Sequence, residues 1–365
     1  GWKILSMAPA IGDSRVWLPS QDTGGEWRHR VASAPRGTWV DRVHQMTPLL
    51  GRQALPARPQ LTIQPRNFAA DDPGGWDRLV DTAVAADAAG IDRIILSDHV
   101  VFGENPEAYA DPTRGGTKGG RQPTGPDGHW LEPLTTLAFL AGQTTRVRLG
   151  TSILLAALRR PVVLAKTAAT LDVLSGGRFD LGVGVGWQEE EYTAAGLEFA
   201  ARGRQLDHTL EVCQTLWGQS RASYESPELS FDGIHAMPKP LQAGGVPIWI
   251  GGTVQRRSME RLARFGSGWI PWGPAVADLK GGVRAMREAR EPPGRDTATV
   301  QVTSYLPAIM DSDGVLDLAA TVTAAPTWVE LGITDFKVPM VVPAGLGPAT
   351  EALTGLVEAF RAAVG

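Results

Sequence analysis

The sequence predicts one (β/α)8 TIM barrel with insertions, preceded by an irregular N-terminal segment. Three observations favour this fold. From Pro59 onward, short β-rich apolar runs alternate with helical patterns, as they do in parallel β/α proteins. The alternation gives eight strand-then-helix units, which favours a closed barrel over an open doubly wound sheet. A length of 365 residues also lies within the range of such a barrel with insertions.

Composition and simple motifs exclude several other classes of protein. Hydrophobic residues make up 43% and charged residues 20% of the chain, and the formal net charge is −4, so we expect neither nucleic-acid nor membrane partners. Cys213 is the single cysteine, which rules out a disulfide framework within one chain. The six histidines lack HxH or HExxH spacing and no GxSxG elbow occurs, so we expect no metal and no acyl-enzyme. With no signal-peptide core, we expect a cytoplasmic protein.

Residues 1–57 differ from the rest of the chain. Four tryptophans, Trp2, Trp17, Trp27 and Trp39, are scattered among Arg, Gly, Pro and Ser without a strand or helix period. We therefore divide the chain into an N-terminal extension of uncertain structure, residues 1–57, and a barrel domain, residues 58–365. The extension is either an appended segment or an arm over the active site.

The first four units follow in order from Pro59. Each strand is a short apolar run, and each helix is a stretch whose apolar residues recur every three or four positions. A loop rich in glycine and proline, residues 103–129, follows the second strand, and its length indicates a substrate lid. The predicted strands are residues 60–64, 92–96, 147–155 and 179–185. The predicted helices are residues 76–89 and 133–143, a run that ends at Ser175, and residues 204–217.

The last four units follow a second insert, residues 223–245. This insert contains a strand-like piece, residues 229–231, that we expect to turn at Asp232-Gly233. The predicted strands are then residues 246–250, 269–272, 300–308 and 336–340. The predicted helices are residues 255–265, 276–290, 315–331 and 348–363.

The candidate catalytic residues follow the predicted strands, because barrel active sites lie at the carboxyl ends of the strands. His99 follows an apolar strand and an acidic residue, which suits a general acid or base, and a structural histidine is the alternative. Asp98 either orients the His99 ring or caps the loop. The later strand ends contribute Thr151-Ser152, Gly186-Trp187, residues 251–253 and residues 269–272.

Glycines and hydroxyls at strand ends favour binding of a phosphate or a flat ring, because bare backbone can approach a ligand closely. Gly251, Gly252 and Thr253 lead directly into a helix, whose first N–H groups attract anions, and Arg256 or Arg257 could add charge. A tight turn is the alternative explanation for these glycines.

The run Gly182-x-Gly184-x-Gly186 is a weak match to a dinucleotide fingerprint. Its third glycine has the wrong spacing, and no acidic residue ends a following strand about 20 residues later. We interpret these glycines as the surface on which a large planar group lies.

Five segments together resemble the luciferase-like monooxygenase family. They are LSDH at residues 96–99, LGTS at 149–152, AKTAATLDVLSGGR at 165–178, GVGVGW at 182–187 and PIWIGG at 247–252. The resemblance extends over about residues 59–360 and leaves out residues 1–57. Within the family, the chain is most similar to the branch that uses the deazaflavin coenzyme F420, and a second branch uses FMN.

The resemblance implies a coenzyme ring across the carboxyl ends of the strands, with hydride passing between ring and substrate. It implies a non-prolyl cis peptide at Ser152–Ile153 beneath the ring, and His99 as the residue that moves the substrate proton. The sugar-phosphate dehydrogenases of the family have a glutamate where this chain has Trp187, which argues against that reaction and for an apolar or aromatic substrate. Glu189 and Glu190 are uncertain substitutes and fit better as an acidic first turn of a helix.

From these observations we expect an F420-dependent oxidoreductase, and a homodimer is implied by the resemblance. An FMN-dependent monooxygenase is the first alternative, and a coenzyme-binding barrel without turnover is the second. His99 is the expected catalytic residue. The residues expected to contact the coenzyme are Asp98, His99, Thr151, Ser152, Gly186, Trp187, Gly251, Gly252 and Thr253.

Overall fold

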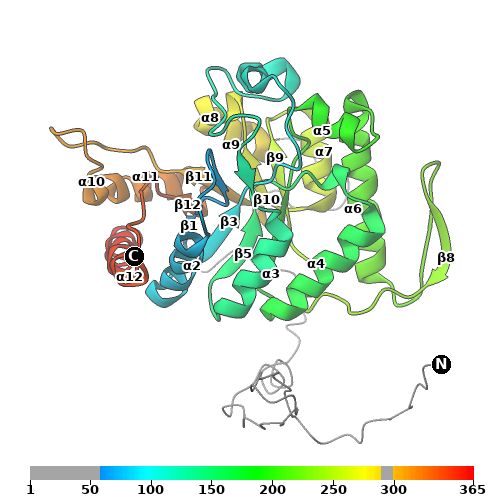
Figure 1. The fold of residues 1–365 in the computed structure, drawn as a ribbon, viewed down its shortest axis with the longest axis horizontal. Coiled ribbons are helices and arrows are strands. Elements are labelled where there is room, and N and C mark those ends of the chain that lie inside the picture. The colour runs from blue at the N-terminus through cyan, green and yellow to red at the C-terminus, as the bar shows by residue number, and fades with distance from the viewer. Residues whose placement is uncertain (1–57, 289–298) are drawn as a thin grey trace, which may run out of the picture. The chain divides into compact units, whose positions relative to one another are not determined.

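Eight parallel strands close into a barrel in the computed structural model, which describes residues 58–288 and 299–365 (Figure 1). The predicted (β/α)8 fold is therefore confirmed, while the expectation for residues 1–57 lies outside the described residues. In spatial order around the barrel the strands are β1 (Gln60–Ile63), β12 (Asp335–Lys337), β11 (Gln301–Tyr305), β10 (Gly266–Pro271), β9 (Ile248–Gly252), β6 (Phe179–Val183), β5 (Arg148–Thr151) and β3 (Arg93–Leu96).

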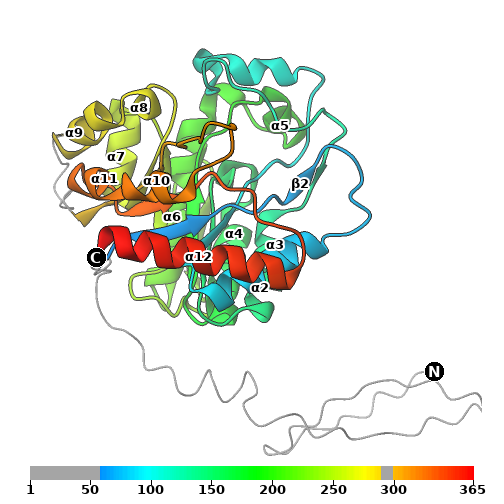
Figure 2. The same ribbon diagram turned by 90° about the vertical axis from the view of Figure 1, so that its left-hand side faces the viewer.

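The helices surround the barrel, and α12 lies beside α2, so that the last helix packs against the first (Figure 2). Their bounds are α2 (Asp77–Ala89), α3 (Pro133–Gln143), α4 (Pro161–Ser175), α5 (Glu189–Ala194), α6 (Arg202–Gly218), α7 (Arg256–Phe265), α8 (Pro274–Ala277), α9 (Leu279–Glu288), α10 (Leu318–Thr323), α11 (Ala325–Glu330) and α12 (Leu346–Val364). None of the helices in the described ranges is both long and apolar enough to cross a membrane.

Two predicted helices are each divided in the structure. The stretch predicted at residues 276–290 forms α8 and α9, which meet at Asp278. The stretch predicted at residues 315–331 forms α10 and α11, and Pro326 lies in the first turn of α11. Proline is tolerated there because the first N–H groups of a helix have no partner within it.

The second insert forms a hairpin of β7 (Ala222–Glu225) and β8 (Ser230–Ile234) that extends away from the barrel (Figure 1). The predicted turn at Asp232-Gly233 is wrong, because both residues lie within β8. The chain turns at Ser226 instead, whose hydroxyl accepts hydrogen bonds from the N–H groups of Glu228 and Leu229. A side chain that bonds to its own following backbone stabilises such a turn without a glycine.

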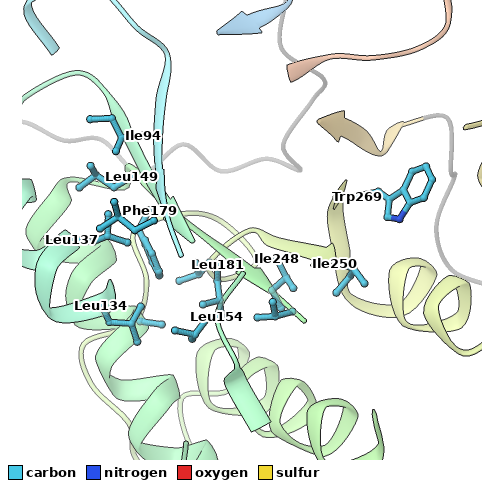
Figure 3. Close-up of a cluster of buried hydrophobic side chains, with 14 of the residues drawn as sticks. Ile94, Leu134, Leu137, Leu149, Leu154, Phe179, Leu181, Ile248, Ile250 and Trp269 are labelled. Carbon is cyan, nitrogen blue, oxygen red and sulfur yellow. The ribbon is translucent and has the colours of Figure 1, made fainter. Parts of the chain in front are cut away.

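Large apolar side chains point outward from the strands and pack against the helices. Figure 3 shows this core, in which Leu149 of β5 and Leu181 of β6 lie near Leu134 and Leu137 of α3. Every second residue points to the same side of a strand. The residues between these outward leucines therefore point into the barrel, and they are the ones that can build a site.

The inward-facing side chains are charged near the amino-terminal ends of the strands and small near the carboxyl-terminal ends. Arg93 of β3 contacts Asp180 of β6 at 3.0 Å and Asp335 of β12 at 3.2 Å, and its guanidinium lies over the Trp249 ring. Near the carboxyl-terminal ends the inward-facing residues are largely glycine, such as Gly182, two residues beyond Asp180 on β6. The charged layer closes the bottom of the barrel, and the glycines leave its carboxyl-terminal mouth free of bulky side chains.

Candidate active site

The segment after β3 is held in place by one buried amide. The Asn67 side chain donates to the carbonyls of Ser97 and Leu131, at 2.9 Å each, and accepts from the Ser97 N–H at 3.2 Å. Asn67 is completely buried. A fully bonded buried amide specifies one backbone geometry, so the two residues that follow Ser97, Asp98 and His99, have defined positions at the barrel mouth.

His99 is oriented by Glu191 rather than by Asp98. Its Nδ1 lies 3.3 Å from Oε2 of Glu191, a side chain with no exposed surface; this is an ion-pair distance, and the two atoms do not have hydrogen-bond geometry. The other carboxylate oxygen of Glu191 accepts the Val100 N–H at 2.7 Å, so the carboxylate is anchored to the same segment. Glu191 lies in the first turn of α5, which also contains Glu189 and Glu190 and thus confirms the predicted acidic turn.

The other ring nitrogen of His99 faces the loop of residues 103–129. Its Nε2 lies 3.1 Å from Nε2 of Gln122. An amide nitrogen only donates hydrogen bonds, so His99 Nε2 is the acceptor and its Nδ1 carries the proton that faces Glu191. This tautomer leaves Nε2 as the atom that can take a proton from a substrate.

Aromatic rings enclose His99. The centroid of its ring lies 4.4 Å from that of Phe102, 4.8 Å from that of Trp130 and 5.9 Å from that of Trp187. Trp187 is only 5% exposed, and its Nε1 has no hydrogen-bond partner within the described ranges. The surface next to His99 is therefore apolar and largely dry, which favours an apolar or aromatic ligand.

Asp98 points away from the mouth and stabilises the next strand end. Its Oδ2 accepts the Leu155 N–H at 2.8 Å, and its two oxygens receive Arg159 at 2.5 and 3.0 Å. Burial raises the pKa of the Asp98 carboxyl, and Arg159 opposes that rise. Of the two expected roles, the capping role is therefore correct and the ring-orienting role is wrong, because both oxygens are occupied by the loop after β5.

The peptide bond between Ser152 and Ile153 is cis, as the family resemblance implied. The Thr151 hydroxyl does not face the mouth, because it donates to the Gly182 carbonyl at 2.7 Å. Ile153 instead projects over the strand ends: a Cβ on Gly184 would lie 2.7 Å from its Cδ1, and a Cβ on Gly251 would lie 2.8 Å from its Cγ2. Ile153 and these glycines form a smooth apolar floor at the barrel mouth.

Gly186 ends the β6 segment with a φ of 68°. A Cβ there would lie 2.6 Å from Cδ2 of Leu155, so a side chain is excluded by both backbone conformation and space. Gly115 of the loop approaches Gly186 closely, since a Cβ on Gly115 would lie 2.9 Å from the Gly186 carbonyl oxygen. This loop therefore covers Gly186 directly.

The loop of residues 103–129 is tied to the barrel at several points. Trp272, after β10, donates from Nε1 to the Gly115 carbonyl at 3.0 Å, and Arg114 contacts Glu189 at 2.9 Å. Tyr109 of the loop stacks edge-on against Trp187, with ring centroids 5.4 Å apart. The loop thus adds the roof of the mouth, in agreement with a lid.

The glycines after β9 precede α7. Gly252 has a φ of 155°, and a Cβ there would lie 3.2 Å from the Ser258 hydroxyl. The buried Trp269 donates from Nε1 to the Gly252 carbonyl at 3.0 Å, which makes it a structural residue rather than a site residue. Gly251 faces the floor and Thr253 lies just before the first turn of α7, so the two could serve different parts of one ligand.

A cavity of about 370 Å³ lies on the outside of the barrel between α6 and α7. Five arginines and two acidic residues are among its lining residues, and Arg256 and Arg257 open α7 close to Gly252 and Thr253. The lining consists of Ala200, Ala201, Arg204, Asp207, Arg256, Arg257, Glu260, Arg261, Arg264 and Phe265. Four of these arginines are in ion pairs with carboxylates, so most of their charge is compensated.

The family model for luciferase-like monooxygenases matches residues 60–330 of this chain, which include seven of the eight barrel strands and the residues around His99. The chain belongs to the luciferase-like monooxygenase family. The family contains oxidoreductases and monooxygenases, among them F420-dependent and FMN-dependent proteins.

Relatives of this luciferase-like chain include two bacterial proteins. It is 32% identical over 205 residues to an uncharacterised protein of Mycobacterium tuberculosis, covering 56% of this chain and 68% of that protein. It is 30% identical over 257 residues to an F420-dependent glucose-6-phosphate dehydrogenase of Kineococcus radiotolerans, covering 68% of each chain. A solved structure with the same fold, riboflavin lyase with modified FMN and riboflavin, matches with a TM-score of 0.54 and 20% identity, covering 74% of this chain and 70% of that one.

The luciferase-like barrel brings most of the predicted residues to one mouth. His99, Trp187, Ser152, Gly186 and the glycines after β9 surround it, whereas the Asp98 and Thr151 side chains are directed into structural hydrogen bonds. Sequence reasoning missed four residues that complete the mouth, since none of them follows a predicted strand in a recognisable motif: Tyr109, Gln122, Trp130 and Glu191.

Proposed function

We propose that this protein is an oxidoreductase that transfers a hydride between coenzyme F420 and an apolar or aromatic organic substrate. The observation that carries the proposal is the pairing of His99 with the buried Glu191 beside an apolar floor and an aromatic wall. F420 supplies or accepts the hydride when bound. The chain has to bind and orient the two reactants, exclude water and move one proton.

The residues of the mouth fit a flat ring system. Ile153 with Gly184 and Gly251 offers a surface without polar side chains, on which a planar group can lie. The first N–H groups of α7, with Thr253 before them, fit a phosphate, because helix N-termini attract anions. Arg257, in the first turn of α7, would add charge to this position.

His99 would act through Nε2. In the absence of a substrate this atom accepts the Gln122 amide, and a substrate hydroxyl would replace that amide as the hydrogen-bond donor. The buried Glu191 would stabilise the imidazolium that forms when Nε2 takes the proton, since its carboxylate faces Nδ1. Trp187 and Tyr109 would keep water from the reacting atoms.

Titration of the purified protein with F420 and with FMN, followed by fluorescence, tests the proposal. We expect saturable binding of F420 and weaker binding of FMN. Absence of binding of both would refute the proposed function. Tighter binding of FMN, with oxygen consumption when it is reduced, would favour the FMN-dependent monooxygenase.

His99→Ala separates catalysis from coenzyme binding. We expect coenzyme affinity within about twofold of the wild type, and turnover lower by roughly 10²- to 10⁴-fold with a panel of aromatic alcohols and ketones. If the variant keeps full turnover, His99 is not catalytic. If the wild type binds coenzyme but turns over no substrate, the barrel is better explained as a coenzyme carrier. A homodimer also remains part of the proposal, and light scattering would measure it.

A further inference from the structure

Lys337 is a buried cation at the carboxyl end of β12. It lies in register with Thr62 of β1 and Tyr305 of β11, so its side chain shares the inward face with Asp335, two residues earlier. Only 8% of the residue's surface is accessible. Lysine is among the residues least often buried, because removing its charge from water is costly unless an anion compensates.

The carboxylate nearest to Lys337 is shared with other groups. Oδ1 of Asp335 accepts the Thr62 hydroxyl at 2.6 Å and lies 3.2 Å from Nη1 of Arg93. Within the described ranges, the Lys337 ammonium has no hydrogen bond to an acceptor, and it lies 4.2 Å from the centroid of the Tyr305 ring. Burial lowers the pKa of Lys337 to about 8, and Asp335 opposes this only in part. The ammonium is therefore incompletely neutralised.

A chain of hydrogen bonds links this cation to the segment of His99. The Tyr305 hydroxyl donates to Oε1 of Gln64 at 2.8 Å, and Nε2 of Gln64 donates to the Ser97 hydroxyl at 2.8 Å. Ser97 precedes His99 by two residues. Lys337 and His99 thus lie at the same barrel mouth, joined along one side by Tyr305, Gln64 and Ser97.

Tyr305 ends β11 beside Lys337 and is 48% exposed, so this end of the barrel is open to solvent next to the buried lysine. Desolvation raises the pKa of Tyr109, in the lid, and the charge of an ionised Tyr305 would raise it further.

We propose that Lys337 binds a carboxylate of the substrate, on the β12 side of the barrel mouth that also contains His99 and Trp187. The inference rests on the proposed function, because it assigns the substrate to this mouth. An ammonium with three donors and no acceptor of its own suits a monoanionic oxygen group. The phenol of Tyr109 can add a donor from the lid. The substrate class is then an apolar or aromatic molecule with one acidic group.

Benzoate and benzamide are matched probes for this site, since they share a ring and differ in charge. Calorimetric titration of the full chain, with and without saturating coenzyme, should give about tenfold tighter binding of benzoate. In Lys337→Met the preference should vanish, and in Lys337→Arg it should persist. Coenzyme affinity, measured separately by fluorescence, should change less than twofold in both variants.

A wild-type chain that binds coenzyme but binds benzoate no better than benzamide overturns the inference and leaves the proposed function standing. A preference for benzoate that survives in Lys337→Met also overturns it, because another cation must then be responsible. If the wild-type chain does not bind the coenzyme, the proposed function is refuted instead. The wild-type comparison needs no variant, so misfolding of Lys337→Met would not prevent the test.

Discussion

Nδ1 of His99 lies 3.3 Å from Oε2 of the fully buried Glu191. This contact joins the end of β3 to the first turn of α5. Two barrel strands, β5 and β6, lie between these elements in the sequence. The contact determines which nitrogen of His99 carries the proton, and therefore which atom is free to react with a substrate. The adjacent Asp98 cannot take this role, because Arg159 and the Leu155 N–H occupy it.

Glu191→Gln should reverse the tautomer of His99. The new amide can still accept the Val100 N–H through its oxygen, but it then presents an N–H to Nδ1, which forces the ring proton onto Nε2. Long-range proton–nitrogen NMR of the histidine rings should show this change, and turnover should fall roughly 10²-fold or more. Glu189→Gln is the matched control, because Glu189 is 54% exposed and contacts only the surface of the lid through Arg114. Unchanged ring signals in Glu191→Gln would contradict the assignment.

Gly184→Ala should raise the coenzyme Kd and lower the free energy of unfolding, and the protein should still fold. The added methyl would meet the flexible end of Ile153 at 2.7 Å and push that side chain into the floor of the mouth. We expect at least about a tenfold rise in the coenzyme Kd, with a loss of stability of about 1–3 kcal/mol in urea unfolding. Gly142→Ala, in α3 with open space around it, should leave the Kd unchanged and stabilise the chain by about 0.5–1 kcal/mol. Equal affinities of Gly184→Ala and wild type would argue against Ile153 as the floor.

Arg159→Met should destabilise the protein, because it leaves the buried Asp98 carboxylate without its counter-ion. Breaking a buried pair on one side costs about 3–5 kcal/mol. The remaining effect of burial is to raise the pKa of Asp98 in the folded state, so the folded variant binds more protons than the unfolded chain above pH ~4. Its free energy of unfolding should therefore decrease as pH rises from that value. Arg256→Met removes an exposed pair with Glu260 and should change stability by less than about 0.5 kcal/mol.

Lys337→Met should raise the free energy of unfolding above that of the wild type, and the difference should be largest at neutral pH. The pKa of Lys337 is lowered to about 8 in the folded state, from an ordinary 10.5, so the cost of burying its charge is fully present below pH 8. Between about pH 8 and 10.5 the unfolded wild-type chain binds more protons than the folded one, and wild-type stability rises relative to the variant. The difference in unfolding free energy between variant and wild type should shrink by up to about 3 kcal/mol across this range. A difference that is independent of pH would show that Lys337 is not desolvated.

The sequence alone was sufficient for the architecture. Alternating strand and helix patterns predicted all eight units, and α3 begins and ends at the predicted residues 133 and 143. Local signals are strong here because most strands are buried apolar runs, and helices such as α2 and α4 end at glycine. The cis bond at Ser152–Ile153 was also predicted, in this case from resemblance to a family rather than from the residues themselves.

Only the tertiary structure decided which side chains of the site contact one another. Asp98 is adjacent to His99 in sequence and yet points away from it, while Glu191 reaches it from another element; side-chain direction of this kind depends on which partners the fold brings near. Lys337 belongs to no motif that the sequence shows. Its significance follows only from the closed barrel, which places it beside Tyr305. Local periodicity is encoded in neighbouring residues, whereas contacts across a barrel mouth arise only when distant strands close upon one another.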